Sequence, residues 1–218
     1  MRHFTRAVVF TGLVCGALLH RPSSAQAAVV VLGNGMGYRC YEMALAMSLG
    51  FPQPEYAHTD TEKTQTPVEA CSAAISAQQM DAHDLAGSYV NRGVLYFLEL
   101  RYDAALKDFD QAIRIDASIA DAYANKGAVL VALHQWADSV AATTKGIQMG
   151  SSEQAKAYFN RALASEELGK VKDAYFDFLE ASELAPDWAQ PKFELEHFSV
   201  RRVSEAPAPK VEDQPSSS

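Results

Sequence analysis

Apolar and small side chains recur along the middle of the chain at a fixed interval. Tyr89, Asn91, a basic residue and Gly93 return 34 residues later around Tyr123. They return again 35 residues after that around Tyr158, with Ala162 in place of the glycine. Within each interval the apolar positions have the three-to-four-residue spacing of two amphipathic helices. A fixed period of this length indicates stacked pairs of helices, none of which buries its apolar face alone.

The residue types within each interval resemble the tetratricopeptide repeat. The first copy has the complete pattern: Tyr89, Gly93, Tyr96, Ala105, Phe109 and Ala112. The third copy restores it with Tyr158, Ala162, Gly169, Ala174, Phe178, Ala181 and Pro186, whereas the second copy has Ser139 and Thr143 in place of the small and aromatic residues. The resemblance implies an all-α fold, a short right-handed superhelical solenoid of three helix pairs at residues 86–119, 120–154 and 155–188.

The segments on both sides of the repeats are expected to close the ends of the solenoid. Upstream, residues 28–85 contain a capping-box signal, Thr66-Pro67-Val68-Glu69, that opens a helix to about Met80. Residues 37–50 would form its partner in an N-terminal helical cap. Downstream, residues 189–203 predict a C-terminal capping helix that packs Phe193, Leu195 and Phe198 against the third repeat. Residues 204–218 have almost nothing to bury, and we expect disorder there.

The first 27 residues have the pattern of a secretory signal peptide. Arg2 and Arg6 give a basic start, residues 7–19 are almost entirely apolar, and Ala25-Gln26-Ala27 has small residues at the cleavage positions. The apolar run is short for a bilayer span, so an uncleaved anchor is the weaker alternative. We therefore expect a periplasmic or secreted protein without membrane insertion after cleavage.

Cleavage would leave two cysteines, Cys40 and Cys71, each at the start of a helix-like run. An even pair in an oxidising compartment favours a disulfide, and buried free thiols are the alternative. The bridge would join the two helices of the N-terminal cap.

The charge balance argues against nucleic acid as a partner. The formal net charge of −8 falls by three, to −11, when the signal and its three arginines are removed. A surface so acidic repels phosphate backbones.

No catalytic, metal or cofactor site is expected from the sequence. Gly33-Asn34-Gly35-Met36-Gly37 follows an apolar run, but no second strand accompanies it as a dinucleotide-binding fold requires. The four histidines after the signal have no metal-ligand spacing. A small enzyme or phosphate-ligand binder that uses Gly33 to Gly37 stays as a minor alternative.

By the resemblance, the first helix of each repeat lines a concave groove that binds a peptide or helix of a partner protein. The residues carried over are Val90, Asn91, Val94, Phe97, Ala124, Asn125, Ala128, Val131, Lys156, Phe159, Asn160 and Leu163. Some members of the family clamp a terminal carboxylate. Asn91, Asn125 and Lys156 match that arrangement, but Gly87 and Asn160 stand where it has Lys and Arg.

The resulting hypothesis is an adaptor or scaffold in a bacterial cell envelope, with no enzymatic activity. The alternative is self-assembly, in which another copy of the chain fills the groove and forms a homo-oligomer.

Overall fold

The computed structural model describes residues 8–12, 36–48, 66–77 and 80–202, and these are almost entirely helical. The helices are α1 Met36–Ser48, α2 Pro67–Ser76, α3 Ala82–Leu98, α4 Tyr102–Ile115, α5 Ala120–Ala132, α6 Trp136–Gln148, α7 Gln154–Glu167, α8 Val171–Leu184 and α9 Ala189–Leu195. Two short strands, β1 Val8–Gly12 and β2 Phe198–Arg202, pair antiparallel.

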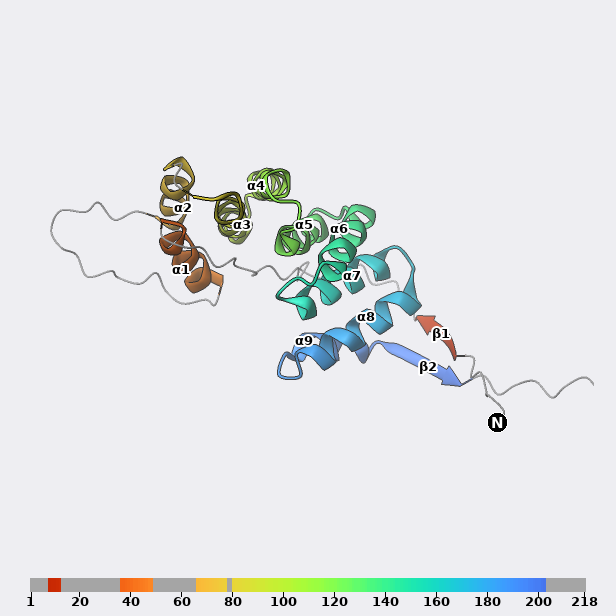
Figure 1. The fold of residues 1–218 in the computed structure, drawn as a ribbon. Coiled ribbons are helices and arrows are strands. Elements are labelled where there is room, and N and C mark those ends of the chain that lie inside the picture. The colour runs from red at the N-terminus through yellow and green to blue at the C-terminus, as the bar shows by residue number, and fades with distance from the viewer. Residues whose placement is uncertain (1–7, 13–35, 49–65, 78–79, 203–218) are drawn as a thin grey trace, which may run out of the picture.

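The helices stack in chain order as antiparallel pairs, with α1 and α2 at one end and α9 with the strands at the other (Figure 1). We call α3, α5 and α7 the A helices and α4, α6 and α8 the B helices. Each A helix packs on its own B helix and on the A helices of neighbouring pairs. The predicted all-α solenoid is confirmed.

The turn between the helices of each pair has one residue in the left-handed backbone region. Leu100, His134 and Gly169 occupy equivalent positions there, with φ of 60°, 58° and 73°. Gly150, after α6, has φ of 77°. The two glycines suit this conformation, because a side chain at positive φ crowds the backbone.

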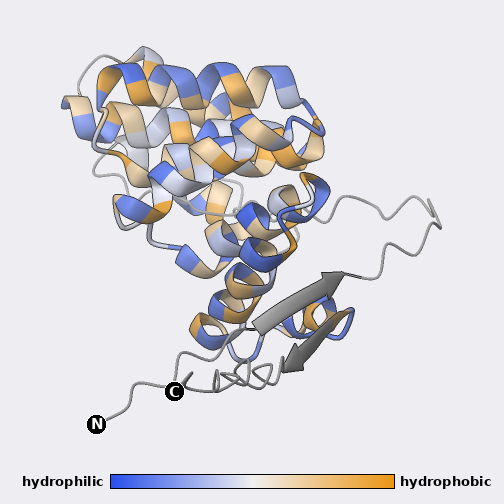
Figure 2. Ribbon diagram, turned by 90° about the vertical axis from the view of Figure 1, so that its right-hand side faces the viewer, coloured by the Kyte–Doolittle hydropathy of each residue, from blue (hydrophilic) through white to orange (hydrophobic). Residues whose placement is uncertain are grey.

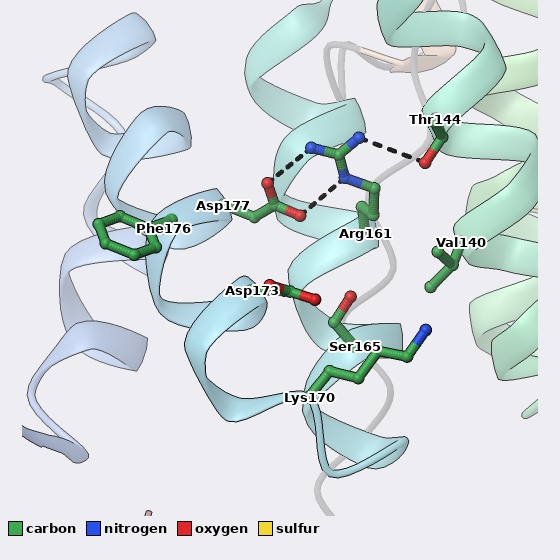
Figure 3. Close-up of a pocket in the computed structure, with 8 residues that line it drawn as sticks. All are labelled: Val140, Thr144, Arg161, Ser165, Lys170, Asp173, Phe176 and Asp177. Atoms are coloured by element: carbon green, nitrogen blue, oxygen red, sulfur yellow. Dashed lines mark hydrogen bonds and ion pairs between the residues drawn. The ribbon is translucent and has the colours of Figure 1, made fainter. Parts of the chain in front are cut away.

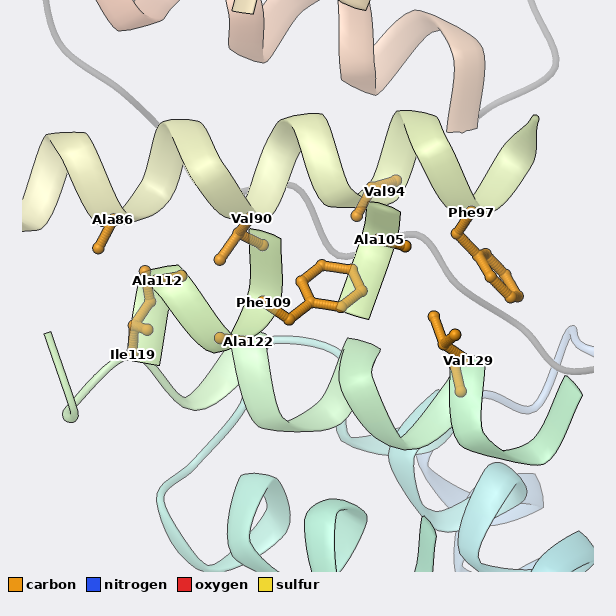
Figure 4. Packing of buried hydrophobic residues seen from close by; sticks show 11 residues of the cluster. Ala86, Val90, Val94, Phe97, Ala105, Phe109, Ala112, Ile119, Ala122 and Val129 are labelled. Carbon is orange, nitrogen blue, oxygen red and sulfur yellow. The ribbon is translucent and has the colours of Figure 1, made fainter. Parts of the chain in front are cut away.

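The interior lies between the helix layers, and Figure 2 shows apolar segments interleaved with polar ones along every helix of the stack. The largest cluster joins the first and second pairs around Phe109 (Figure 4). Gly93 permits this packing: a Cβ there would be 2.6 Å from Cε1 of Phe109. The small residue on the A helix and the large one on the B helix therefore fit as the sequence pattern predicts.

In the second pair, polar side chains fill the space between the A and B helices. Thr143 occupies the place of the aromatic residue, against Gly127. Its hydroxyl donates to the Ser139 carbonyl at 2.6 Å, and the Ser139 hydroxyl donates to the Gly127 carbonyl at 2.9 Å. Both side chains are fully buried without an unsatisfied group.

The N-terminal cap has the expected form. Thr66 and Glu69 make both hydrogen bonds of the capping box, at 3.2 and 2.8 Å, so α2 begins where its signal predicts. The structure contains the Cys40–Cys71 disulfide, which joins α1 to α2 and lies buried against Leu95 of α3.

The C-terminal capping helix is shorter than predicted, and part of that prediction is wrong. Helix α9 ends at Leu195, and residues 198–202 form a strand instead. The sequence Phe198-Ser199-Val200-Arg201 alternates apolar and polar residues, which is the period of a strand rather than of a helix. Leu195 and Phe198 pack against the third pair as expected, but Phe193 is 58% exposed.

The partner of this strand, β1, lies within the predicted signal peptide. The rest of the signal, most of the Gly33 to Gly37 motif and the C-terminal tail lie outside the described residues, and the predictions for them stay predictions.

Candidate functional site

The A helices present equivalent residues in register. The Tyr-x-Asn-basic motif lies near the middle of each A helix. Three asparagines, Asn91, Asn125 and Asn160, therefore occupy the same position in successive repeats. We call this set the asparagine row. All three are buried, with exposed fractions of 1%, 2% and 1%, and each already has an interaction partner. A buried amide that is retained in three repeats is costly unless its donor and acceptor are used.

Several of the predicted groove residues are interior residues in the structure. Val90, Val94, Phe97 and Ala128 belong to the core cluster between the first and second pairs. Phe159 belongs to the cluster of the third pair, where its ring centroid lies 4.8 Å from that of Trp188. These five side chains do not line an open groove, because neighbouring helices pack directly on the helix faces to which they belong.

The remaining predicted residues flank the asparagine row. Ala124 and Val131 are also buried, whereas Lys156 and Leu163 are partly exposed. Whether this set binds a peptide stays a prediction.

The charged groups beside the asparagine row are already paired within the chain. Nζ of Lys156 lies 3.2 Å from a carboxylate oxygen of Glu153. Oδ1 of Asp121 accepts hydrogen bonds at 2.8 Å from the Ser151 hydroxyl and from the Ser152 backbone N–H. The clamp positions Gly87 and Asn160 supply no cation. Lys156 and Asp121 are therefore both held by residues of the same chain.

Basic side chains next to the asparagines point the other way, toward the B helices. Arg92 donates to both carboxylate oxygens of Asp108, at 2.7 and 2.9 Å, and to the Ser72 hydroxyl at 3.1 Å. This paired, partly buried geometry raises the pKa of Arg92, chiefly through the hydrogen bond to Asp108.

The third pair repeats this contact, and the second varies it. Arg161 donates to both carboxylate oxygens of Asp177 at 2.7 Å. Hydrogen bonding to Asp177 is the main reason that the pKa of Arg161 is raised. Lys126 reaches back to Asp110 of the first pair, at 2.6 Å. Sequence reasoning missed these contacts, although an Arg followed by an Asp sixteen residues later occurs in both complete repeats.

A surface pocket of about 300 Å³ lies between α6 and α8, on the B-helix side (Figure 3). The Arg161–Asp177 pair and Thr144 form one wall, and Ser165, Lys170, Asp173 and Phe176 surround the rest. Two acidic and two basic side chains line the pocket, and Arg161 and Asp177 among them are bonded to each other.

Within the part of the chain that the structure describes, no group of three or more His, Cys, Asp or Glu side chains could hold a metal ion. Over the same residues, none of the helices combines the length and hydropathy of a bilayer crossing.

Comparison with known proteins gives a consistent result. The family described as Tetratricopeptide repeat matches residues 86–119 and 155–187, which are the first and third pairs. Protein STIP1 homolog from Dictyostelium discoideum is 33% identical over 89 residues, 41% of this chain and 16% of that protein. The mitochondrial import receptor subunit TOM70 from Rattus norvegicus is 28% identical over 104 residues, 45% of this chain and 17% of that protein. The chain thus spans about a sixth of the length of these relatives.

Solved structures share the fold at lower identity. The Arabidopsis OM64 TPR domain has a TM-score of 0.50 and 23% identity, over 53% of this chain and 94% of that one. A double mutant of MamA RS-1 has a TM-score of 0.53 and 15% identity, over 76% and 83%. Together the comparisons support a helical fold of tetratricopeptide repeats.

Proposed function

The chain belongs to the tetratricopeptide-repeat family, and from that premise we propose that it is a binding module that holds a peptide segment of a partner protein on its A helices. The repeat stack carries this proposal. Three successive A helices present residues at equivalent positions, which suits a ligand that runs across the stack.

Hydrogen exchange of the α3, α5 and α7 amides should change when the ligand binds, while that of α4 and α6 should change less.

A peptide-display selection on the purified protein tests the proposal. We expect a library of random 12-residue peptides to yield specific binders to the full chain. The variant Lys156→Ala, which removes a partly exposed predicted site residue on α7, should weaken their binding, and the matched control Lys107→Ala, which removes an exposed lysine on α4, should leave it unchanged. Thermal melts of both variants show whether they are folded. If no peptide is selected, or if folded Lys156→Ala binds as well as the unaltered protein, the A helices are not the binding site.

We further propose that the module acts outside the cytoplasm, as an adaptor in a bacterial cell envelope. The supporting observations are the basic start at Arg2 and Arg6, the apolar run that follows and the Ala25-Gln26-Ala27 cleavage pattern. The Cys40–Cys71 bridge is compatible with an oxidising compartment.

A further inference from the structure

The pocket between α6 and α8 contains polar groups that the packing of the helices does not use. We propose that it binds a small zwitterion, an α-amino acid with an apolar side chain. The pocket lies on the B-helix side, so this site is separate from the peptide-binding surface proposed for the A helices and does not depend on it.

The hydroxyl of Ser165 is the first indication of a ligand. Ser165 lies near the end of α7 and is 3% exposed, but its hydroxyl makes no hydrogen bond to another residue that the structure describes. Over the same residues, every fully shielded polar side-chain atom has a partner, so the Ser165 oxygen opens into the pocket that it lines. A largely buried hydroxyl is costly unless solvent or a ligand completes its hydrogen bonds.

Two of the four charged side chains around the pocket are occupied by each other. Arg161 and Asp177 form a pair through two hydrogen bonds. Lys170 and Asp173 make no ion pair with each other or elsewhere in the described part of the chain. Figure 3 shows them on opposite sides of Ser165. The pocket therefore has one ammonium and one carboxylate group for a ligand.

This pair of charges matches a zwitterion. The ammonium of Lys170 and the hydroxyl of Ser165 would donate to the ligand carboxylate. The carboxylate of Asp173 would accept hydrogen bonds from the ligand ammonium. A ligand with a single charge would satisfy only one of the two charged side chains.

The start of α8 supports this orientation. Lys170 is the residue that precedes the helix, and no side chain caps the first-turn N–H groups. The partial positive charge of a helix N-terminus attracts a carboxylate. Asp173 lies three residues further on, and side chains at this spacing are neighbours with Cβ atoms about 5–6 Å apart. One small ligand can therefore contact both.

The size of the pocket and its remaining walls favour an apolar ligand side chain. The volume of about 300 Å³ is at the lower end of the range for small-molecule sites. Val140 of α6 and Phe176 of α8 provide apolar surface, and Phe176 is 48% exposed. A ligand side chain that covers them removes apolar area from water, which favours binding.

Three ligands with the same side chain test the proposal on the unaltered full chain. They are L-leucine, isocaproate, which lacks the ammonium group, and leucine amide, which lacks the carboxylate. Each is titrated at the same salt concentration, and NMR follows the backbone amides of Ser165, Lys170 and Asp173. We expect leucine to saturate these shifts with a Kd on the order of 1 mM, because partly exposed charges bind weakly. Isocaproate and leucine amide should bind at least about fivefold more weakly.

Variants assign each charge to its part of the ligand. Lys170→Met should weaken leucine and isocaproate at least about fivefold and leave leucine amide within about twofold. Asp173→Asn should weaken leucine and leucine amide and leave isocaproate unchanged. Ser165→Ala should weaken leucine about threefold, as loss of one hydrogen bond does. The matched control is Lys172→Met, which removes an exposed lysine of α8 outside the pocket and should change none of the three affinities.

The ligand series decides the proposal even if a variant fails to fold, which thermal melts reveal. No saturable binding of leucine, or equal or tighter binding of either singly charged ligand, would overturn the zwitterion site. An equal loss in Lys172→Met and Lys170→Met would also overturn it, because the charge responsible would then lie outside the pocket. None of these results bears on peptide binding by the A helices, which the display selection tests separately.

Discussion

Leu100 is a residue in a conformation that its side chain disfavours. Its φ is 60°, and its side chain is 71% exposed, so little packing offsets the backbone strain. We expect Leu100→Gly to increase the free energy of unfolding by about 1 kcal/mol, because glycine adopts this region without steric cost. Urea unfolding measures the change.

Leu168 serves as the control for this change. It is also exposed and also lies just after the last residue of an A helix, but its φ is −81°. Leu168→Gly should give no stabilisation, since glycine only adds disorder to the unfolded chain there. Equal effects at both positions would mean that strain at Leu100 is not the cause.

The carboxylate of Asp116, in the loop after α4, contributes to the stability of the fold at low pH. Hydrogen bonds from the Ser118 hydroxyl, then from His83 and the Ser118 N–H, lower its pKa from 3.8 to about 2. Because the folded pKa lies below the unfolded one, the carboxylate stabilises the fold above about pH 4, and this contribution is lost as the pH falls through about 2. Ser118→Ala removes the largest cause, so the Asp116 titration followed by NMR should move to higher pH. An unchanged midpoint would contradict this origin.

At the scale of elements, the Arg92–Asp108 contact joins α3 to α4 and, through Ser72, to α2. Both charged side chains are largely buried. Arg92→Met leaves a buried carboxylate without its partner, and we expect it to lower the free energy of unfolding by about 3 kcal/mol. Chemical denaturation measures this loss.

Lys126 provides the comparison, since its ion pair with Asp110 is more exposed. Lys126→Met should cost less than about 1 kcal/mol. In the double variant Arg92→Met/Asp108→Leu, removal of the stranded carboxylate should restore part of the loss. If both single variants cost the same, burial does not set the strength of these contacts.

For the whole molecule, the sequence predicts those structural features that recur in each repeat. The helix pairs and the Gly93–Phe109 contact follow from residue types that recur, and Gly150 and Gly169 suit helix ends in the left-handed region. The strand at 198–202 occurs once, directly after the helical pattern of α9. A single short alternation of apolar and polar residues is a weaker signal than the longer helical pattern before it.

The burial of the groove residues could not be predicted in the same way. Position within a repeat tells which helix face carries Val90, Val94 or Phe159. It does not tell how closely the next helix approaches that face, because this depends on side chains of another repeat. The sequence shows asparagine at the same position of three repeats, but only the structure shows that these side chains are buried and already have partners.

The disulfide and the signal peptide make one joint prediction about the whole chain. If residues 1–27 direct export, the protein recovered from the periplasm or the culture medium should begin at Ala28 and contain the Cys40–Cys71 bridge. Its thiols should not react with maleimide after denaturation until reductant is added. The same chain without residues 2–27 should stay in the reducing cytoplasm with both thiols reactive.

The two forms should also differ in stability. The bridge connects residues 31 apart and holds α1 against α2 and α3. In the chain-entropy description its loss costs about 3–4 kcal/mol. The reduced form should therefore melt at lower temperature, with faster hydrogen exchange in α1 than in α5 to α8. The double variant Cys40→Ala/Cys71→Ala should melt equally with and without reductant. Reactive thiols in an exported chain would show that the bridge does not form there, and the cap would then depend on packing alone.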